Sequence, residues 1–140
     1  MLIVHTSLKP SPIHGLGCFT NQRIRRGDIV WVFDPRIDRR LPVEDLTGLP
    51  EPAQELFHRY GYVEMYRGQR VVTLCGDHSK HMNHSDTPNL INGEEPLDTN
   101  VAVRDIEEGE ELTCNYYSFD LDAERKLGTR AATVGGGFRE

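Results

Sequence analysis

Three short segments of this chain carry side chains that could bind a polar ligand or take part in a reaction. Residues 83–89, NHSDTPN, begin with an asparagine, whose amide offers both donors and an acceptor. Residues 15–17, GLG, would let a ligand approach the backbone closely. Residues 109–116, GEELTCNY, end in Tyr116, whose hydroxyl needs a partner where it is buried. Each segment alone also has an ordinary explanation, because the first two are rich in turn formers and Tyr116 could be a core aromatic.

A fourth pattern has the composition of a metal site, because it spaces Cys75, His78, His81 and His84 three residues apart. Cysteine and histidine are good zinc ligands. Steps of three residues rotate successive side chains around a helix, however, and no HExxH motif is present. We therefore expect no metal, and a metal-dependent hydrolase is the weakest of the functional alternatives. No P-loop occurs either, and no GxGxxG motif opens a helix.

The elements that must position these segments are mostly short strands. The residue pattern predicts strands at residues 2–4, 18–20, 29–33, 62–66, 71–75, 100–103 and 111–115. A short helix is indicated by Ala53, Leu56, Phe57 and Tyr60, which share one helical face. Residues 34–52 are polar with four prolines and suggest an inserted loop, and residues 120–127 suggest a last helical turn or two closed by Gly128. The expected fold is β-rich with an inserted helix.

Composition limits the setting in which the chain works. The 140 residues suit one domain. The net charge of -6 argues against direct nucleic acid binding and for basic partners. Three cysteines without a CxxC pair favour a reducing compartment, and neither a signal peptide nor a membrane-spanning apolar run is present. These features predict a soluble, intracellular protein of the cytoplasm that does not enter a membrane.

In this order the three segments resemble the SET-domain family of protein lysine methyltransferases, over about residues 3–117, and the chain looks like the minimal, stand-alone members. The resemblance implies a β-clip of small curved sheets around a knot-like crossing, in which the segment of Asn83 threads beside that of Tyr116. It also implies a SET domain at residues 1–119, with an inserted helical segment at about 43–60, and a short C-terminal flank at residues 120–140.

The same resemblance assigns roles to residues and a cofactor, S-adenosyl-L-methionine. The residues implied to bind the cofactor are His14, Gly15, Leu16, Gly17, Asn83, His84 and Tyr116. Tyr116 would also be the catalytic residue, with its hydroxyl at the point of methyl transfer. Cys114 and Tyr117 would line the channel for the substrate lysine, and Cys114 stands where a larger aromatic residue often narrows that channel.

The chain departs from the family at the flank that normally closes the site. Asp86 occupies a position where many members have a zinc-binding cysteine, and no cysteine follows Cys114. The C-terminal tail, through Phe119 or Phe138, would then cover the adenine instead. A second copy of the chain could also supply the missing flank, so a homodimer is one expected assembly.

The expected function is methyl transfer to a lysine side chain of a basic protein substrate. The acidic residues Glu94, Glu95 and Asp98 could steer such a substrate, or they could belong to a solvated loop. The main alternative is a SET-like binding module without turnover, because a fold does not guarantee an activity.

Overall fold

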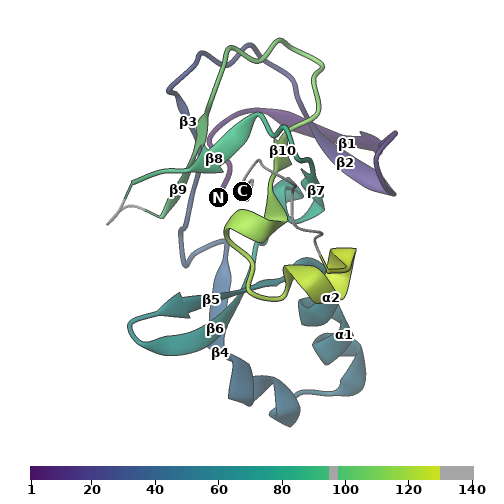
Figure 1. The fold of residues 1–140 in the computed structure, drawn as a ribbon, viewed down its shortest axis with the longest axis vertical. Helices are drawn as coiled ribbons and strands as arrows, with labels where there is room; N and C mark the ends of the chain where they lie inside the picture. The colour runs from purple at the N-terminus through teal and green to yellow at the C-terminus, as the bar shows by residue number, and fades with distance from the viewer. Residues whose placement is uncertain (95–97, 130–140) are drawn as a thin grey trace, which may run out of the picture.

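The computed structural model describes residues 1–94 and 98–129. Short strands of two to six residues form four small sheets within this part of the chain, accompanied by two short α-helices and three 3-10 helices. Figure 1 shows the strands in two groups, with the C-terminal segment running between them. The prediction of a β-rich fold with few helices is confirmed.

The first group surrounds the main hydrophobic core. Its strands are β1 (Thr6–Pro10), β2 (Leu16–Thr20), β3 (Ile29–Val32), β7 (Asn83–His84), β8 (Leu90–Asn92), β9 (Thr99–Ala102) and β10 (Thr113–Cys114). β1 and β2 form an antiparallel hairpin, and the next sheet has the order β3-β9-β8. Ile24, Leu90, Ile106 and Leu112 are almost fully buried between these elements. Burial of such apolar side chains supplies most of the favourable free energy of folding.

The second group is the inserted unit, which lies in the lower half of Figure 1. It contains β4 (Arg39–Pro42), the 3-10 helix Val43–Gly48, α1 (Glu51–Tyr60), β5 (Tyr62–Tyr66) and β6 (Gln69–Leu74), with the sheet order β4-β6-β5. Phe57 of α1 packs with Leu46 and Val72 in a second small core. α1 stops at Gly61, where a Cβ would lie 2.6 Å from the carbonyl oxygen of Phe57. The predicted helix is therefore confirmed.

Several predicted elements differ from those observed. The strand expected at residues 2–4 is reduced to a single bridge between Leu2 and Trp31. The strand expected at 111–115 shortens to β10. Strand β1 was not predicted, because its sequence TSLKP lacks alternating apolar residues. The expected loop at residues 34–52 was wrong in part, since it contains β4, a 3-10 helix and the start of α1.

The predicted hairpin of β5 and β6 is present, with a turn of two residues where four were expected, so that β6 begins at Gln69. Arg67 and Gly68 at this turn both have positive φ, of 51° and 78°. Such a turn suits the twist of the two strands. The last helix, α2 (Ala123–Leu127), ends as expected at Gly128, whose φ is 89°. No helix in the described ranges is both long and apolar enough to span a bilayer.

One pairing brings distant segments of the chain together. β7 lies parallel to β10, with Asn83 opposite Thr113 and His84 opposite Cys114. The segment of Asn83 therefore lies beside the segment that leads into Tyr116, as the family resemblance implied. α2 follows this segment and lies next to α1 in Figure 1.

Candidate active site

Asn83 connects all three of the segments that the sequence singled out. Its Nδ2 group lies 3.0 Å from the carbonyl oxygen of His14, 3.1 Å from that of Leu16 and 2.9 Å from Oε2 of Glu111, and it donates to all three. Two N–H groups are thus shared among three acceptors. Asn83 is buried, so these bonds fix the loop before β2 against β7 and against the segment before β10.

Glu111, like Asn83, connects separate segments around the site, because it accepts hydrogen bonds from both Ser11 and Asn83. The hydroxyl of Ser11 lies 2.8 Å from both carboxylate oxygens of Glu111. A Cβ at residue 17 would lie only 2.3 Å from Glu111 Oε2, so the close approach of this carboxylate requires Gly17. The second glycine of the GLG segment is thus explained by a contact within the protein.

Tyr116 is held at both its backbone and its hydroxyl. The hydroxyl donates to the carbonyl oxygen of Met82. The backbone N–H of Tyr116 donates to Nδ1 of His84 at 3.1 Å, and Nε2 of His84 lies 3.1 Å from Oδ1 of Asp86. Because a backbone amide can only donate, the proton of a neutral His84 must be on Nε2, which donates to Asp86. Burial raises the pKa of Tyr116, so its hydroxyl keeps its proton and remains a donor.

A pocket of about 100 Å³ lies beside Tyr116. It is partly open to solvent, and we call it the enclosed pocket only to distinguish it from the larger groove described below. The side chains that form its apolar walls are Trp31, Tyr62, Met82, Cys114, Tyr116 and Phe119. The Phe119 ring meets Tyr62 and Tyr116 edge to face, with centroids 5.2 and 5.9 Å apart. Cys114 Sγ lies 3.6 Å from Met82 Sδ, and burial raises the pKa of Cys114 to about 12. Aromatic walls of this kind suit a long aliphatic side chain.

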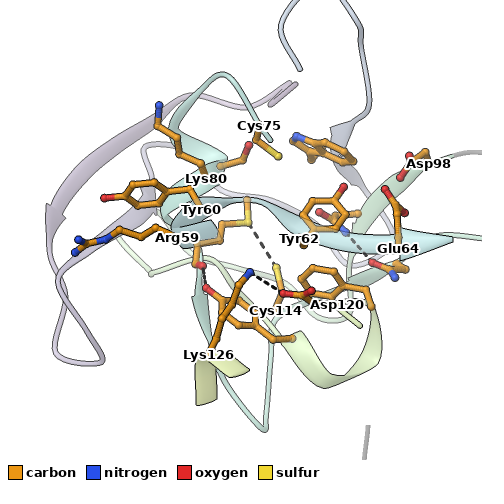
Figure 2. A pocket seen from close by; sticks show the side chains of 17 residues that line it. Arg59, Tyr60, Tyr62, Glu64, Cys75, Lys80, Asp98, Cys114, Asp120 and Lys126 are labelled. Carbon is orange, nitrogen blue, oxygen red and sulfur yellow. Dashed lines mark hydrogen bonds and ion pairs between the residues drawn. The ribbon is translucent and has the colours of Figure 1, made fainter. Parts of the chain in front are cut away.

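Charges are separated around this enclosed pocket. Figure 2 shows Arg59 and Lys80 on one side and Glu64 and Asp98 on the other. Arg40 bridges the two carboxylates, because its guanidinium lies 3.1 Å from Glu64 and also contacts Asp98. One guanidinium thus faces two carboxylates, and burial raises the pKa of Glu64 in spite of that pairing.

A larger, open groove of about 960 Å³ also has Tyr116 in its wall. Its walls come from residues 14–16, residues 80–83, the end of α1 and the end of α2. Six residues line both the groove and the enclosed pocket, and we call them the junction: Arg59, Tyr60, Lys80, Met82, Tyr116 and Lys126. The two cavities therefore adjoin at these six residues, and Tyr116 is among the side chains that both share.

A buried ion pair lies at the junction. Lys126 Nζ is 2.7 Å from Asp120 Oδ2, and the side chains of Lys126 and Asp120 are 15% and 1% exposed. The same ammonium donates to the carbonyl oxygen of Gly61 and lies 5.8 Å from the centre of the Tyr116 ring. Figure 2 shows Lys126 reaching toward Asp120 beside Cys114.

The structure brings together most of the residues predicted for the site. His14, Gly15, Leu16, Asn83 and Tyr116 line the groove, and Cys114 and Tyr116 line the enclosed pocket. Three others do not line either cavity in the described part of the chain. Gly17 lies under Glu111, His84 supports the backbone of Tyr116, and Tyr117 donates its hydroxyl to the carbonyl oxygen of Gly128.

Other site residues were not predicted from the sequence. Tyr62, Met82, Asp120 and Lys126 line the cavities, and none belongs to a motif that would have revealed them. Phe119 was expected over the adenine but lines the enclosed pocket. Phe138 lies outside the described residues.

The proposed metal pattern receives no geometric support. His78 Nδ1 contacts the Thr6 hydroxyl at 2.9 Å, and the ring of His81 meets that of Tyr60. His84 is engaged with Tyr116 and Asp86, as described above. Across residues 1–94 and 98–129, no three His, Cys, Asp or Glu side chains gather in a group that could hold a metal ion.

Solved structures share this fold at low sequence identity. Chaetomium thermophilum Polycomb Repressive Complex 2, in an autoinhibited conformation bound to S-adenosylmethionine, matches with a TM-score of 0.64 and 20% identity over 89% of this chain and 16% of that one. A humanized mutant of that complex bound to the inhibitor GSK126 matches with a TM-score of 0.63 and 20% identity, over 87% of this chain and 16% of that one. CpSET8 from Cryptosporidium matches with a TM-score of 0.58 and 22% identity, over 81% of this chain and 57% of that one.

This chain thus spans well under two thirds of the length of each of these relatives. A search of curated proteins finds no match. The SET domain model, however, matches residues 15–117, a range that begins at the glycine segment and ends just after Tyr116. The chain therefore belongs to the SET-domain family.

Proposed function

We propose that the protein transfers a methyl group from S-adenosyl-L-methionine to a lysine side chain of a protein substrate. The observation that carries this proposal is the meeting of two unlike cavities at Tyr116. The open groove would hold the cofactor, and the enclosed pocket would admit the lysine. Membership of the SET-domain family supports the same assignment, because its members are typically protein lysine methyltransferases.

The residues of the groove fit the chemistry of this cofactor. S-adenosyl-L-methionine, when bound, supplies the methyl group on a positively charged sulfonium. Backbone groups of residues 14–16 would contact it, with Asn83 holding these walls in place. Lys80 and Arg59 line the groove and could balance its carboxylate. The aromatic side chain of Tyr60 offers an apolar surface beside these cations.

The chain's own residues would contribute positioning and fixed dipoles. A lysine must be neutral to act as a nucleophile, although the ordinary lysine pKa is ~10.4. The enclosed pocket would keep bulk water from that amine. The Tyr116 hydroxyl and the Met82 carbonyl, already joined by a hydrogen bond, would orient the amine and the methyl group for in-line transfer. No covalent intermediate on the protein is required.

The mouth of the enclosed pocket supports a basic substrate. Glu64 and Asp98 lie there with only one guanidinium between them, so the group keeps net negative charge. Such a mouth would attract a lysine-rich segment and would repel an acidic one. Asp98 was one of the acidic residues expected to steer the substrate.

Radiolabelled methyl transfer into a whole-cell lysate tests the proposal directly. We expect a few labelled proteins with the wild-type chain and none with Tyr116→Phe, and mass spectrometry would then identify the labelled lysines. The alternative, a binding module without turnover, predicts cofactor binding by calorimetry but no label above the Tyr116→Phe background. Absence of both binding and label would reject both functions.

A further inference from the structure

Lys126 is placed where an acceptor amine would be needed. It belongs to the junction, so it borders both the proposed cofactor groove and the proposed lysine pocket. Its ammonium lies 5.8 Å from the centre of the Tyr116 ring, and its side chain is only 15% exposed. A long flexible side chain normally extends into solvent, so this inward position needs an explanation.

The composition makes Lys126 unusual among the cations of the chain. The sequence holds only three lysines, Lys9, Lys80 and Lys126. Lys9 lies on β1, where its ammonium is 5.0 Å from the centre of the Phe19 ring, and it does not line either cavity. Lys80 lines the junction, but the ammonium that contacts the Tyr116 ring belongs to Lys126.

Asp120 lies in position to accept a proton from this lysine. Asp120 Oδ2 is 2.7 Å from Nζ of Lys126, while Oδ1 accepts hydrogen bonds from the backbone N–H groups of Val63 and Asp122 at 3.0 and 2.9 Å. The carboxylate is therefore fixed by the backbone and cannot follow Lys126 if that side chain turns. A base within hydrogen-bond reach of a nucleophile is the usual arrangement for activating an amine.

We propose that Lys126 is a self-methylation site of this protein. The inference rests on the proposed function, because it uses the same methyl donor and the same junction. The positive sulfonium in the groove would disfavour a second positive charge beside it, so Lys126 would lose its proton to solvent by way of Asp120. The nitrogen lone pair then forms the new bond to the methyl carbon. The bond between that carbon and sulfur breaks, and its electron pair leaves with the neutral thioether product.

The local fold allows this transfer to occur within one molecule. α2 has five residues and is held against α1 by Arg125, which donates to the carbonyl oxygen of His58. For transfer, the Lys126 side chain would have to leave the Gly61 carbonyl and Asp120 while its backbone stays in place. A purely structural ion pair would make a different prediction, because it would hold α2 against the inserted unit and would never acquire a methyl group.

Peptide mapping of the full chain after incubation with S-adenosyl-L-methionine tests the proposal without knowledge of any external substrate. We expect mass spectrometry to find added methyl on Lys126 and none on Lys9. Lys126→Arg keeps the positive charge beside Asp120 and should lose the modification, whereas the matched Lys9→Arg change should leave it in place. A tagged Tyr116→Phe chain mixed with the wild type should remain unmodified, because the transfer is intramolecular.

Proton release gives a second measurement that does not depend on turnover. Calorimetry at pH about 9, nearer the ordinary lysine pKa of ~10.4, can be run in buffers of different ionisation enthalpy. Binding of S-adenosyl-L-methionine should release a proton from the wild type and not from Lys126→Arg. The demethylated product, whose sulfur carries no charge, should release none that depends on Lys126.

The outcomes separate this inference from the proposed function. An unmodified Lys126 in a chain that methylates lysate proteins would overturn self-methylation and leave the function intact. Equal proton release from the wild type and from Lys126→Arg would also count against it. A chain that neither binds the cofactor nor transfers methyl to any protein would end both proposals.

Discussion

The enclosed pocket has walls of aromatic and sulfur-containing side chains, with carboxylates at its mouth, whereas the open groove is built from two loops and two helix ends that carry several cations. The basic side chains along the groove are His14, His58, Arg59, Lys80, His81, Arg125 and Lys126, against one carboxylate, Glu55. The pocket measures about 100 Å³ and the groove about 960 Å³. The two cavities thus differ mainly in size and in the balance of charged side chains, because the pocket also has Glu64, Asp98 and Asp120 in its walls. A small pocket can select one side chain, while a larger groove suits a larger ligand.

The difference also separates what each cavity can contribute to a reaction. Met82 and Cys114 of the pocket belong to the main core and Phe119 packs against it, an arrangement that favours alignment of a reacting amine. The groove is assembled from segments far apart in the sequence, and hydrogen bonds from one side chain, Asn83, join two of them. We therefore expect changes in the pocket to alter turnover and product, and changes in the groove to alter cofactor binding.

Tyr116→Phe should have the largest effect, because Tyr116 borders both cavities. Loss of the hydroxyl removes the bond to Met82 and a fixed dipole at the point of transfer. Removing one such group typically lowers turnover by ~10²–10³ while affecting binding much less. Turnover, cofactor affinity and melting temperature should be measured together. Unchanged turnover in a stable variant would show that Tyr116 is only a packed aromatic, since phenylalanine fills nearly the same space.

Asn83→Ala should come next and should affect mainly the groove. The change removes three hydrogen bonds and leaves the carbonyl oxygens of His14 and Leu16 without that donor. His14 and Leu16 are exposed, so water can replace that donor, and the loss is that of the hydrogen bonds themselves, about 0.5–1.5 kcal/mol each. Cofactor affinity should therefore fall by about tenfold. The matched control is Asn21→Ala, which removes an exposed amide bonded to Ser7. Equal affinities for the two variants would contradict a groove held together by Asn83.

The sequence predicted the groove better than the pocket, for a physical reason. The glycines, Asn83 and Tyr116 belong to contiguous motifs, so local residue types reveal them. The pocket depends on single residues such as Tyr62, Phe119 and Asp120, which reach it through the pairing of distant strands. No local signal marks such positions. Gly17 is a different case. The sequence shows the glycine motif to which it belongs, but the contact with Glu111 that favours glycine there forms only in the folded structure.

The same distinction applies to the fold. The β5–β6 hairpin and α1 were predicted because turn residues and helical periodicity are local properties. β1 was missed because its residues carry no alternating pattern, and it forms by pairing with β2. The pairing of β7 with β10 was expected only from the family resemblance, since two-residue strands leave no pattern of their own.

Cys114→Tyr should change the product more than the rate. Cys114 is buried in the wall of the pocket against Met82, so a tyrosine would fill space that a methylated amine needs. We expect the wild type to reach higher methylation states and the variant to stop at monomethyl-lysine. Overpacking costs about 1–3 kcal/mol, so the melting temperature should also fall. Mass spectrometry of the products under excess cofactor measures the methylation state. If the wild type yields monomethyl-lysine and no higher state, the prediction is wrong.

Glu64→Gln should have the smallest effect, and it tests the negative mouth of the pocket through pH. Glu64 accepts hydrogen bonds from Thr73 at 2.7 Å and from Arg40 at 3.1 Å, yet burial raises its pKa above the ordinary value. The folded state therefore holds this proton more tightly than the unfolded state does. Stability contributed by Glu64 is greatest below the ordinary glutamate pKa of ~4.3 and falls as pH rises through the raised pKa.

Glutamine cannot lose a proton, so the free energy of unfolding of Glu64→Gln, relative to the wild type, should increase between pH about 4 and pH about 7. The increase should stay below about 1 kcal/mol, because Arg40 partly balances the charge. Urea denaturation at both pH values measures it, with the exposed Glu94→Gln as the matched control. If the wild type instead gained stability over the variant as pH rose, the pairing with Arg40 would outweigh burial. Glu64 would then be fully ionised at neutral pH, and with Asp98 it would still exceed the single positive charge of Arg40.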